Sequence, residues 1–262
     1  MANKNVIGRC HLCGRKRPLC KSHYFGAAIQ RLCQQDGQAV VMTPKLVIET
    51  QRQVWAHLLC VECEGRLNKF GETPVLRLLD TGKSFSLLDR MDLVPKFLVV
   101  EAGSQTVTYS GEAMGIDTDA LAHFALGLLW KAAVHRWRTV SGQTAGISLP
   151  GYKEKIRKYL LGLTPLPSGI AVIVAACEDH GSRGMVFPPA RFRGQPHRHF
   201  SILTRGIWFD VIVGEDAAAK HSHLCCVRSD KKILIRTNCH RRLMETGKRL
   251  YKTAKVSQRL SG

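Results

Sequence analysis

Two cysteine pairs in the first quarter of the chain have the spacing of zinc ligands. Cys10 and Cys13 are separated by two residues, and Cys60 and Cys63 repeat that spacing further along the chain. Two thiolates at this spacing can hold one tetrahedral ion through a tight turn, and a second pair completes a four-sulfur shell. The two pairs therefore predict one structural Zn²⁺ bound by these four cysteines.

Other cysteines and histidines leave alternatives open. Cys20 and Cys33 can substitute as zinc ligands, although their irregular spacing favours small buried side chains. A second metal site can be drawn from His221, His223, Cys225, Cys226, Cys239 and His240. Alternate residues of a strand share a face, so the first three of these can converge, but no standard zinc spacing is matched. The alternative is polar surface and buried thiols.

Several polar residues have types suited to hydrolysis. An imidazole can accept a proton near neutral pH, so His23 can act as a general base; it can also complete a zinc shell or have only a structural role. Glu64, Asn68 and Glu72 recur every four residues, so they share a face if the helix is continuous. Such oxygen ligands suit Mg²⁺ or Mn²⁺, but the same pattern also fits a solvated helix face. Residues 178–180, Glu-Asp-His, follow a buried apolar stretch and offer a further strand-end site.

The order of these elements resembles the zinc-stapled HNH endonucleases, a treble-clef or ββα-metal family. The matching elements are the first cysteine pair, Ser22-His23, and the second pair followed by Glu64, within about the first 72 residues. The resemblance implies that His23 activates a water against a phosphodiester. It also implies that Glu64 binds a divalent Mg²⁺ or Mn²⁺, which neutralises charge on the scissile phosphate.

The sequence departs from the family pattern at three positions. Ser22 replaces the acidic residue that precedes the base, and Glu64 stands where an asparagine or histidine is expected. Asn68, one helical turn past Glu64, takes the place of the central asparagine. The catalytic set implied by the resemblance is therefore His23, Glu64 and Asn68.

The composition and periodicity predict an α+β protein with two domains. Residues 1–75 form the zinc-binding, HNH-like treble-clef module, with helices over 25–35 and from near Cys63. Residues 76–262 form a larger basic α+β domain with mainly antiparallel strands. Its core is a long helix over 117–137, capped by Thr118 or Asp119. A buried strand over 170–177 and a hairpin over 199–214 complete the prediction.

The charge balance favours an anionic partner. The formal net charge is +19, from 39 Lys and Arg against 20 Asp and Glu. Nucleic acid, DNA more than RNA, is the first candidate, because a phosphate backbone rewards clustered basic residues. The candidate contacts are Arg15, Lys16, Arg17, Arg191, Arg193, Arg198, Arg241 and Arg242. An acidic protein and an anionic membrane surface are the weaker alternatives.

Three functions follow from these patterns. The first is a metal-dependent, HNH-like endonuclease, which by analogy with the family belongs to phage defence or mobile-element biology. The others are a non-catalytic zinc module that binds nucleic acid, and a protein-interaction module. We expect a cytoplasmic protein without a leader or a membrane span, because no apolar run reaches ~18 residues. In that compartment its ten cysteines are expected as thiols or metal ligands rather than disulfides.

Overall fold

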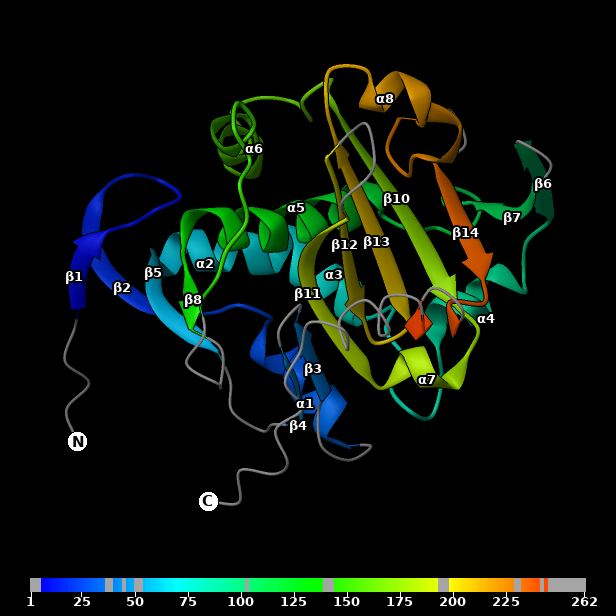
Figure 1. Ribbon diagram of the computed structural model, residues 1–262, viewed down its shortest axis with the longest axis horizontal. Coiled ribbons are helices and arrows are strands. Elements are labelled where there is room, and N and C mark those ends of the chain that lie inside the picture. Colours follow the sequence, from blue (N-terminus) through cyan, green and yellow to red (C-terminus); the bar gives the residue numbers. More distant parts are fainter. Residues whose placement is uncertain are drawn as a thin grey trace.

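The computed structural model describes most of the chain (Figure 1). The described residues are 6–35, 40–43, 46–49, 54–101, 104–138, 144–192, 198–228, 232–240 and 243–244. Helices and strands are both abundant in them, and the predicted α+β class is confirmed.

A small sheet and a helix carry the cysteine pairs. The sheet has the order β1-β2-β5, formed by Val6–Arg9, Lys16–His23 and Trp55–Cys60. Both strand pairs are antiparallel. Helix α2 (Val61–Leu67) starts directly after β5, and η1 (Asn68–Glu72) and α3 (Thr73–Leu76) continue it. Helix α1 (Ala27–Gln35) follows β2, as the sequence predicts.

The larger sheet has nine strands within the described residues, in the order β4-β3-β11-β12-β13-β10-β14-β7-β6. Its strands are β3 (Val40–Thr43), β4 (Leu46–Glu49), β6 (Lys96–Glu101), β7 (Ser104–Ser110), β10 (Ile170–Cys177), β11 (Met185–Phe192), β12 (Arg198–Thr204), β13 (Ile207–Val213) and β14 (Ile233–Thr237). Only the β10–β14 and β11–β3 pairs are parallel among these, so the described sheet is mainly antiparallel, as predicted. β8 (Trp137–Arg138) and β9 (Thr144–Ala145) form a separate short pair.

Helix α5 (Thr118–Val134) lies between the large sheet and the cysteine-bearing unit (Figure 1). It packs against β10, β11 and β13 on one side and against α2, η1 and α3 on the other. Nearly every side chain along it is buried, which confirms it as the core helix. The other helices are α4 (Ser86–Met91), α6 (Lys153–Leu160), α7 (His180–Arg183), α8 (Ala217–Lys220) and the short η2 (Ser222–Leu224).

One hydrophobic core extends across both predicted domains. It runs from Cys10 and Leu12 beside the first cysteine pair to Leu234 on β14. Strands β3 and β4 lie within residues 1–75, yet they belong to the large sheet, where β3 pairs with β11 and β4 pairs with β3. The boundary near residue 75 stays a prediction, and the two parts are packed together through α5.

Two local expectations are wrong. The cap of α5 is Asp117, whose Oδ1 accepts from the amide of Ala120 at 3.0 Å, whereas Thr118 already belongs to the helix. Cys177 and Cys239 form a disulfide across 62 residues, although thiols or metal ligands were expected. The chain brings these cysteines together because β10 and β14 are parallel neighbours that end at the same edge of the sheet.

The hairpin predicted over 199–214 is confirmed as β12 and β13. Its turn residues Arg205 and Gly206 have φ values of +43° and +84°. Two successive positive φ angles are typical of the tight turn whose twist matches that of paired strands. None of the described helices combines the length and the apolar character needed to cross a bilayer.

Candidate functional site

The first cysteine pair lies on a tight turn between β1 and β2. The amide of Cys10 donates to the carbonyl of Arg15 at 2.9 Å, and the amide of Gly14 donates to the carbonyl of Cys10 at 2.8 Å. Gly14 has a φ of +76°, a conformation that costs glycine little and other residues more. The glycine after Cys13 therefore allows the turn that aims both thiols inward.

The second pair lies where β5 ends and α2 begins. Cys60 is the N-cap residue of α2 and Cys63 lies in the first helical turn. The amide of Cys60 donates to Sγ of Cys10 at 3.4 Å, which ties the helix start to the first turn. The positive end of the helix favours negative charge on these sulfurs.

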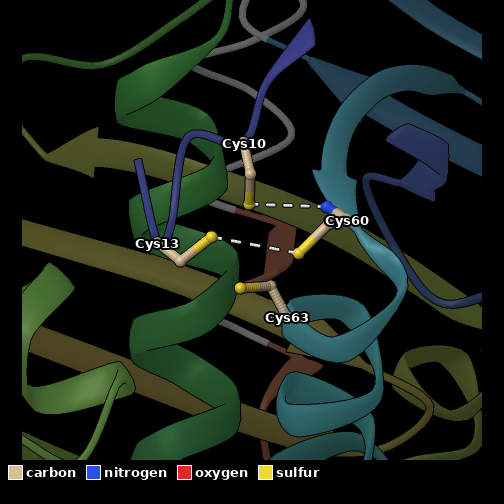
Figure 2. Close-up of side chains that lie close together, drawn as sticks. All are labelled: Cys10, Cys13, Cys60 and Cys63. Carbon is tan, nitrogen blue, oxygen red and sulfur yellow. Dashed lines mark hydrogen bonds between the residues drawn. The ribbon is translucent and has the colours of Figure 1, made fainter. Parts of the chain in front are cut away.

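All four sulfur atoms point toward a common centre (Figure 2). They lie within 4.8 Å of one another, and the sulfurs of Cys13 and Cys60 are 3.9 Å apart. A tetrahedron with Zn–S bonds of ~2.3 Å has edges of about 3.8 Å, so the arrangement suits one zinc ion. The four cysteines thus form a metal-binding group compatible with structural Zn²⁺.

All four thiols of the group can ionise together only if a cation compensates their charge. Burial raises the pKa of Cys60 to about 11 and raises the pKa of Cys63 further. Burial opposes ionisation of Cys10 as well, but hydrogen bonds from the amides around it lower its pKa. Zn²⁺ supplies the charge that makes four clustered thiolates stable in such a place.

The other two cysteines of this region play different parts. Sγ of Cys20 donates to the carbonyl of Leu59 at 3.2 Å, and Cys20 does not belong to the four-cysteine group. Cys33 lies on α1, but its side chain falls outside what the structure describes.

Ser22 is a structural residue of the small sheet. It is completely buried, and its Oγ accepts from the amide of Leu59 at 3.1 Å. The pairing of β2 with β5 shifts register between Cys20 and Lys21, next to this contact. Ser22 therefore satisfies an amide at an irregular point of the ladder, which gives a physical reason for a serine before His23.

His23 ends β2 beside a buried lysine. Nζ of Lys131 on α5 donates to the carbonyl of His23 at 3.1 Å and to Oε1 of Glu64 at 3.2 Å. The side chain of Lys131 is only 6% exposed, and that of Glu64 is 17% exposed. One ammonium thus joins the end of β2 to the first turn of α2, and Glu64 does not lie on a solvated helix face.

Glu64 retains an unused oxygen atom. Its Oε2 is buried and has no hydrogen-bond partner among the described residues. A buried carboxylate oxygen without a donor is costly unless water or a cation meets it. Among the described residues, however, no group of three metal-binding side chains within bonding range contains His23 or Glu64. A divalent ion there would have few protein ligands, as is common for Mg²⁺.

Asn68 and Glu72 lie on η1, a π-helical turn. Eight residues of regular α-helix would rotate Glu72 about 80° away from the direction of Glu64. The wider turn, closed by i→i+5 bonds, reduces that rotation and keeps Glu72 closer to Glu64. Gly71 allows a close approach of the two helices here, because a Cβ atom on it would lie 3.0 Å from the backbone of Phe124 on α5.

Glu72 packs against the start of α1. A Cβ atom on Gly26 would overlap its carboxylate, so the glycine leaves room for the acid. Burial raises the pKa of Glu72; the charge of Glu64 acts in the same direction, while Lys131 and Arg31 oppose the shift. The carboxyl groups of Glu64 and Glu72 and the ammonium of Lys131 therefore form one coupled polar cluster next to His23.

The raised pKa of Glu72 predicts a pH-dependent stability. The folded state favours the neutral acid, so this contribution is full below the ordinary value of 4.5 and is lost as pH rises through the folded pKa. We expect Glu72→Gln to unfold at a higher urea concentration than the wild type at pH 7, with the difference shrinking toward pH 4.5. Glu112→Gln, at an exposed position, should show no such trend. Equal pH profiles for Glu72→Gln and wild type would contradict the prediction.

The predicted nucleic-acid contacts have varied environments. Arg15, Lys16 and Arg191 are exposed. Arg17 is paired with Glu62, and Nη1 of Arg198 donates to the carbonyl of Pro150 at 3.3 Å. Arg193, Arg241 and Arg242 lie outside the described residues.

The second metal site predicted from the histidines and cysteines of the second half of the chain is not the group that the structure brings together there. Cys177, Asp179 and Cys239 have ligand atoms within 4.8 Å, but the two sulfurs are joined in the disulfide. Asp179 instead caps α7 and accepts from the amide of Cys239 at 3.0 Å. In the described part of the chain, His221, His223, Cys225 and Cys226 do not form a metal-binding group.

Comparison with known proteins assigns no relative. No protein-family model, no curated protein and no solved structure matches this chain.

Lys131 is the residue of the site that sequence reasoning missed. Its one available signal was its place as the single basic residue in the otherwise apolar middle and end of α5. A lysine on a helix buried on nearly all sides needs acceptors, since an unpaired buried charge is strongly unfavourable. The acceptors come from β2 and α2, 108 and 67 residues away in sequence.

Proposed function

We propose that the chain is a nucleic-acid phosphodiesterase of the HNH-like type, with its site at the junction of β2, α2 and α5. The observation that carries this proposal is the contact of Lys131 with both His23 and Glu64. The ammonium of Lys131 links the backbone of His23, the proposed base, to the carboxylate of Glu64, the proposed metal ligand. The basic charge of the chain, +19, supports a polyanionic substrate.

His23 has the role of general base in this proposal. Its imidazole takes a proton from the water that attacks the phosphorus atom, and the phosphodiester bond to the leaving oxygen then breaks. Lys131 positions the histidine through the backbone carbonyl, and Ser22 fixes the neighbouring strand pair. A general base of this kind increases the rate by a factor of about 10²–10⁴.

Glu64 and Asn68 would hold a divalent ion. The buried, unpaired Oε2 of Glu64 supplies a hard oxygen, and Asn68 lies one helical turn further on. When bound, Mg²⁺ or Mn²⁺ would stabilise negative charge on the phosphate and the leaving oxygen.

A non-catalytic module that binds nucleic acid or protein is the second candidate. The observation that favours it is the ion pair itself, because Lys131 already compensates the charge of Glu64. An ammonium that already balances the charge of this carboxylate weakens the need for a metal. In that case the polar cluster holds the zinc-bearing unit on α5 and has no chemical role.

Cleavage assays with a histidine variant test the proposal. Wild-type protein should cut supercoiled plasmid, single-stranded DNA or RNA in Mg²⁺ or Mn²⁺. His23→Ala should cut about 10²- to 10⁴-fold more slowly. His180→Ala, at an exposed position on α7, should cut normally. Zinc content and the urea midpoint show that each variant is folded. If folded, zinc-loaded wild type cleaves none of these substrates, the proposed enzymatic activity is refuted and the non-catalytic binding module is the remaining candidate.

A further inference from the structure

The small sheet carries an exposed aromatic ring beside His23. Trp55 is 43% exposed, whereas the other three tryptophans of the chain, Trp130, Trp137 and Trp208, are at most 1% exposed. Trp55 pairs with His23 across β5 and β2, as Cα partners in an antiparallel ladder. Directly opposed residues place their side chains on the same face, with Cβ atoms about 4.5–5.5 Å apart. The exposed indole is therefore the immediate cross-strand neighbour of the proposed base.

Two further side chains complete this face of the sheet. Lys21 and His57 are the next opposed pair with the same orientation, two residues along each strand. Nζ of Lys21 lies 4.7 Å from the centre of the Trp55 ring, and the ring of His57 meets that indole edge-on at 5.4 Å. A cation thus lies over the indole and an imidazole packs against it, while the Trp55 side chain remains partly open to solvent.

We propose that Trp55 is the stacking platform for an unpaired nucleobase of a single-stranded or locally opened polynucleotide. Bases stack on exposed indoles regardless of sequence, and a neighbouring cation meets the backbone phosphate. Duplex bases have both faces covered by their neighbours, so only an unpaired base fits the platform. The phosphate next to a base stacked on Trp55 lies beside Lys21 and His23, where the proposed hydrolysis takes place.

The charges around the platform favour nucleic acid over an acidic protein segment. The nearest exposed charges along β2 are those of Lys16 and Lys21, and Glu62 of α2 is neutralised by Arg17. An acidic peptide would gain from these cations but has no flat π-surface to place on the indole. This inference relies on the proposed function for the class of ligand, and its test reads binding rather than cleavage.

The test uses the fluorescence of the single exposed tryptophan. Full-length, zinc-loaded protein is titrated in the presence of EDTA at a concentration that leaves the zinc bound, with a thymidine 20-mer, the corresponding RNA, a matched duplex and polyglutamate. We expect the single strands to quench Trp55 emission and the duplex and polyglutamate to leave it nearly unchanged. Trp55→Ala should weaken single-strand binding about 5- to 150-fold, the range for one stacked base. Trp55→Phe should keep most of the affinity.

A second exposed aromatic provides the matched control. Phe70 is 42% exposed and lies under the cations of Arg66 and Lys69, on η1 instead of the small sheet. Phe70→Ala should bind single strands as the wild type does. Unchanged affinity in Trp55→Ala, or equal quenching by polyglutamate, would overturn the inference. Stacking on Trp55 without cleavage would refute the proposed hydrolysis but support the stacking platform. Cleavage at the same rate in wild type and Trp55→Ala, without stacking, would support the hydrolysis but refute the platform.

Discussion

Replacing Cys63 with serine should remove zinc from the chain and unfold the unit built on it. Purified wild-type protein should contain about one Zn²⁺ per chain, since the four sulfurs lie within 4.8 Å of one another. Structural zinc contributes about 10–16 kcal/mol of binding free energy at neutral pH in small zinc domains. That is comparable with the ~5–15 kcal/mol by which most domains are stable. The small sheet and α2 share one core with α5, so the loss of zinc should destabilise the whole molecule.

Metal analysis and thermal unfolding measure this effect. Cys63→Ser should hold no stoichiometric zinc and should show a lowered or absent cooperative transition. Cys20→Ala is the matched control, because Cys20 lies on the same sheet but outside the group and bonds a backbone carbonyl. It should keep the metal and most of the stability. A wild-type protein without zinc, or a Cys63→Ser protein with a normal zinc content, would contradict the assignment.

Lys131→Met should destabilise the protein by about 3–5 kcal/mol, the range for removing one partner of a buried ion pair. Methionine preserves most of the length of the side chain but leaves Glu64 with an uncompensated buried charge. It also leaves the carbonyl of His23 without its donor. Adding Glu64→Gln to the same chain removes the charge, so the double variant should lose less than the sum of the single losses.

Urea unfolding of the single and double variants separates the charge effect from packing. Without Lys131, the carboxylate of Glu64 is left buried without its cation, and Glu64→Gln removes that charge. The loss of stability caused by Lys131→Met should therefore be smaller in the Glu64→Gln background than in the wild type. Lys158→Met, an exposed substitution on α6, should change stability by no more than ~0.5 kcal/mol in either background. A loss of stability that is the same with Glu64 and with Gln at position 64 would assign the effect of Lys131 to packing alone.

The local features of the site follow from the sequence. The spacing within each cysteine pair, the glycine after the first pair and the start of a helix at the second pair are short-range patterns. Each of them depends on residues only a few positions apart. Because a tetrahedral zinc site needs both pairs, the zinc-binding group could be predicted together with α1 and the start of α2. The core helix α5 and the hairpin of β12 and β13 were predictable for the same reason, because periodicity and turn residues act over one or two turns.

Contacts between distant segments were decided by the tertiary structure. The sequence placed Glu64 and Asn68 on one helix face but gave no sign that Lys131 would meet Glu64, because the partner lies on another helix 67 residues away. The disulfide of Cys177 and Cys239 depended on the parallel pairing of β10 with β14, and Cys239 follows the end of β14. The pairing of Trp55 with His23 depended on a strand register that shifts by one residue beside Ser22. The sequence by itself determined which groups can do chemistry, and packing across long sequence separations determined which of them meet, since loop closure and register carry no local signature.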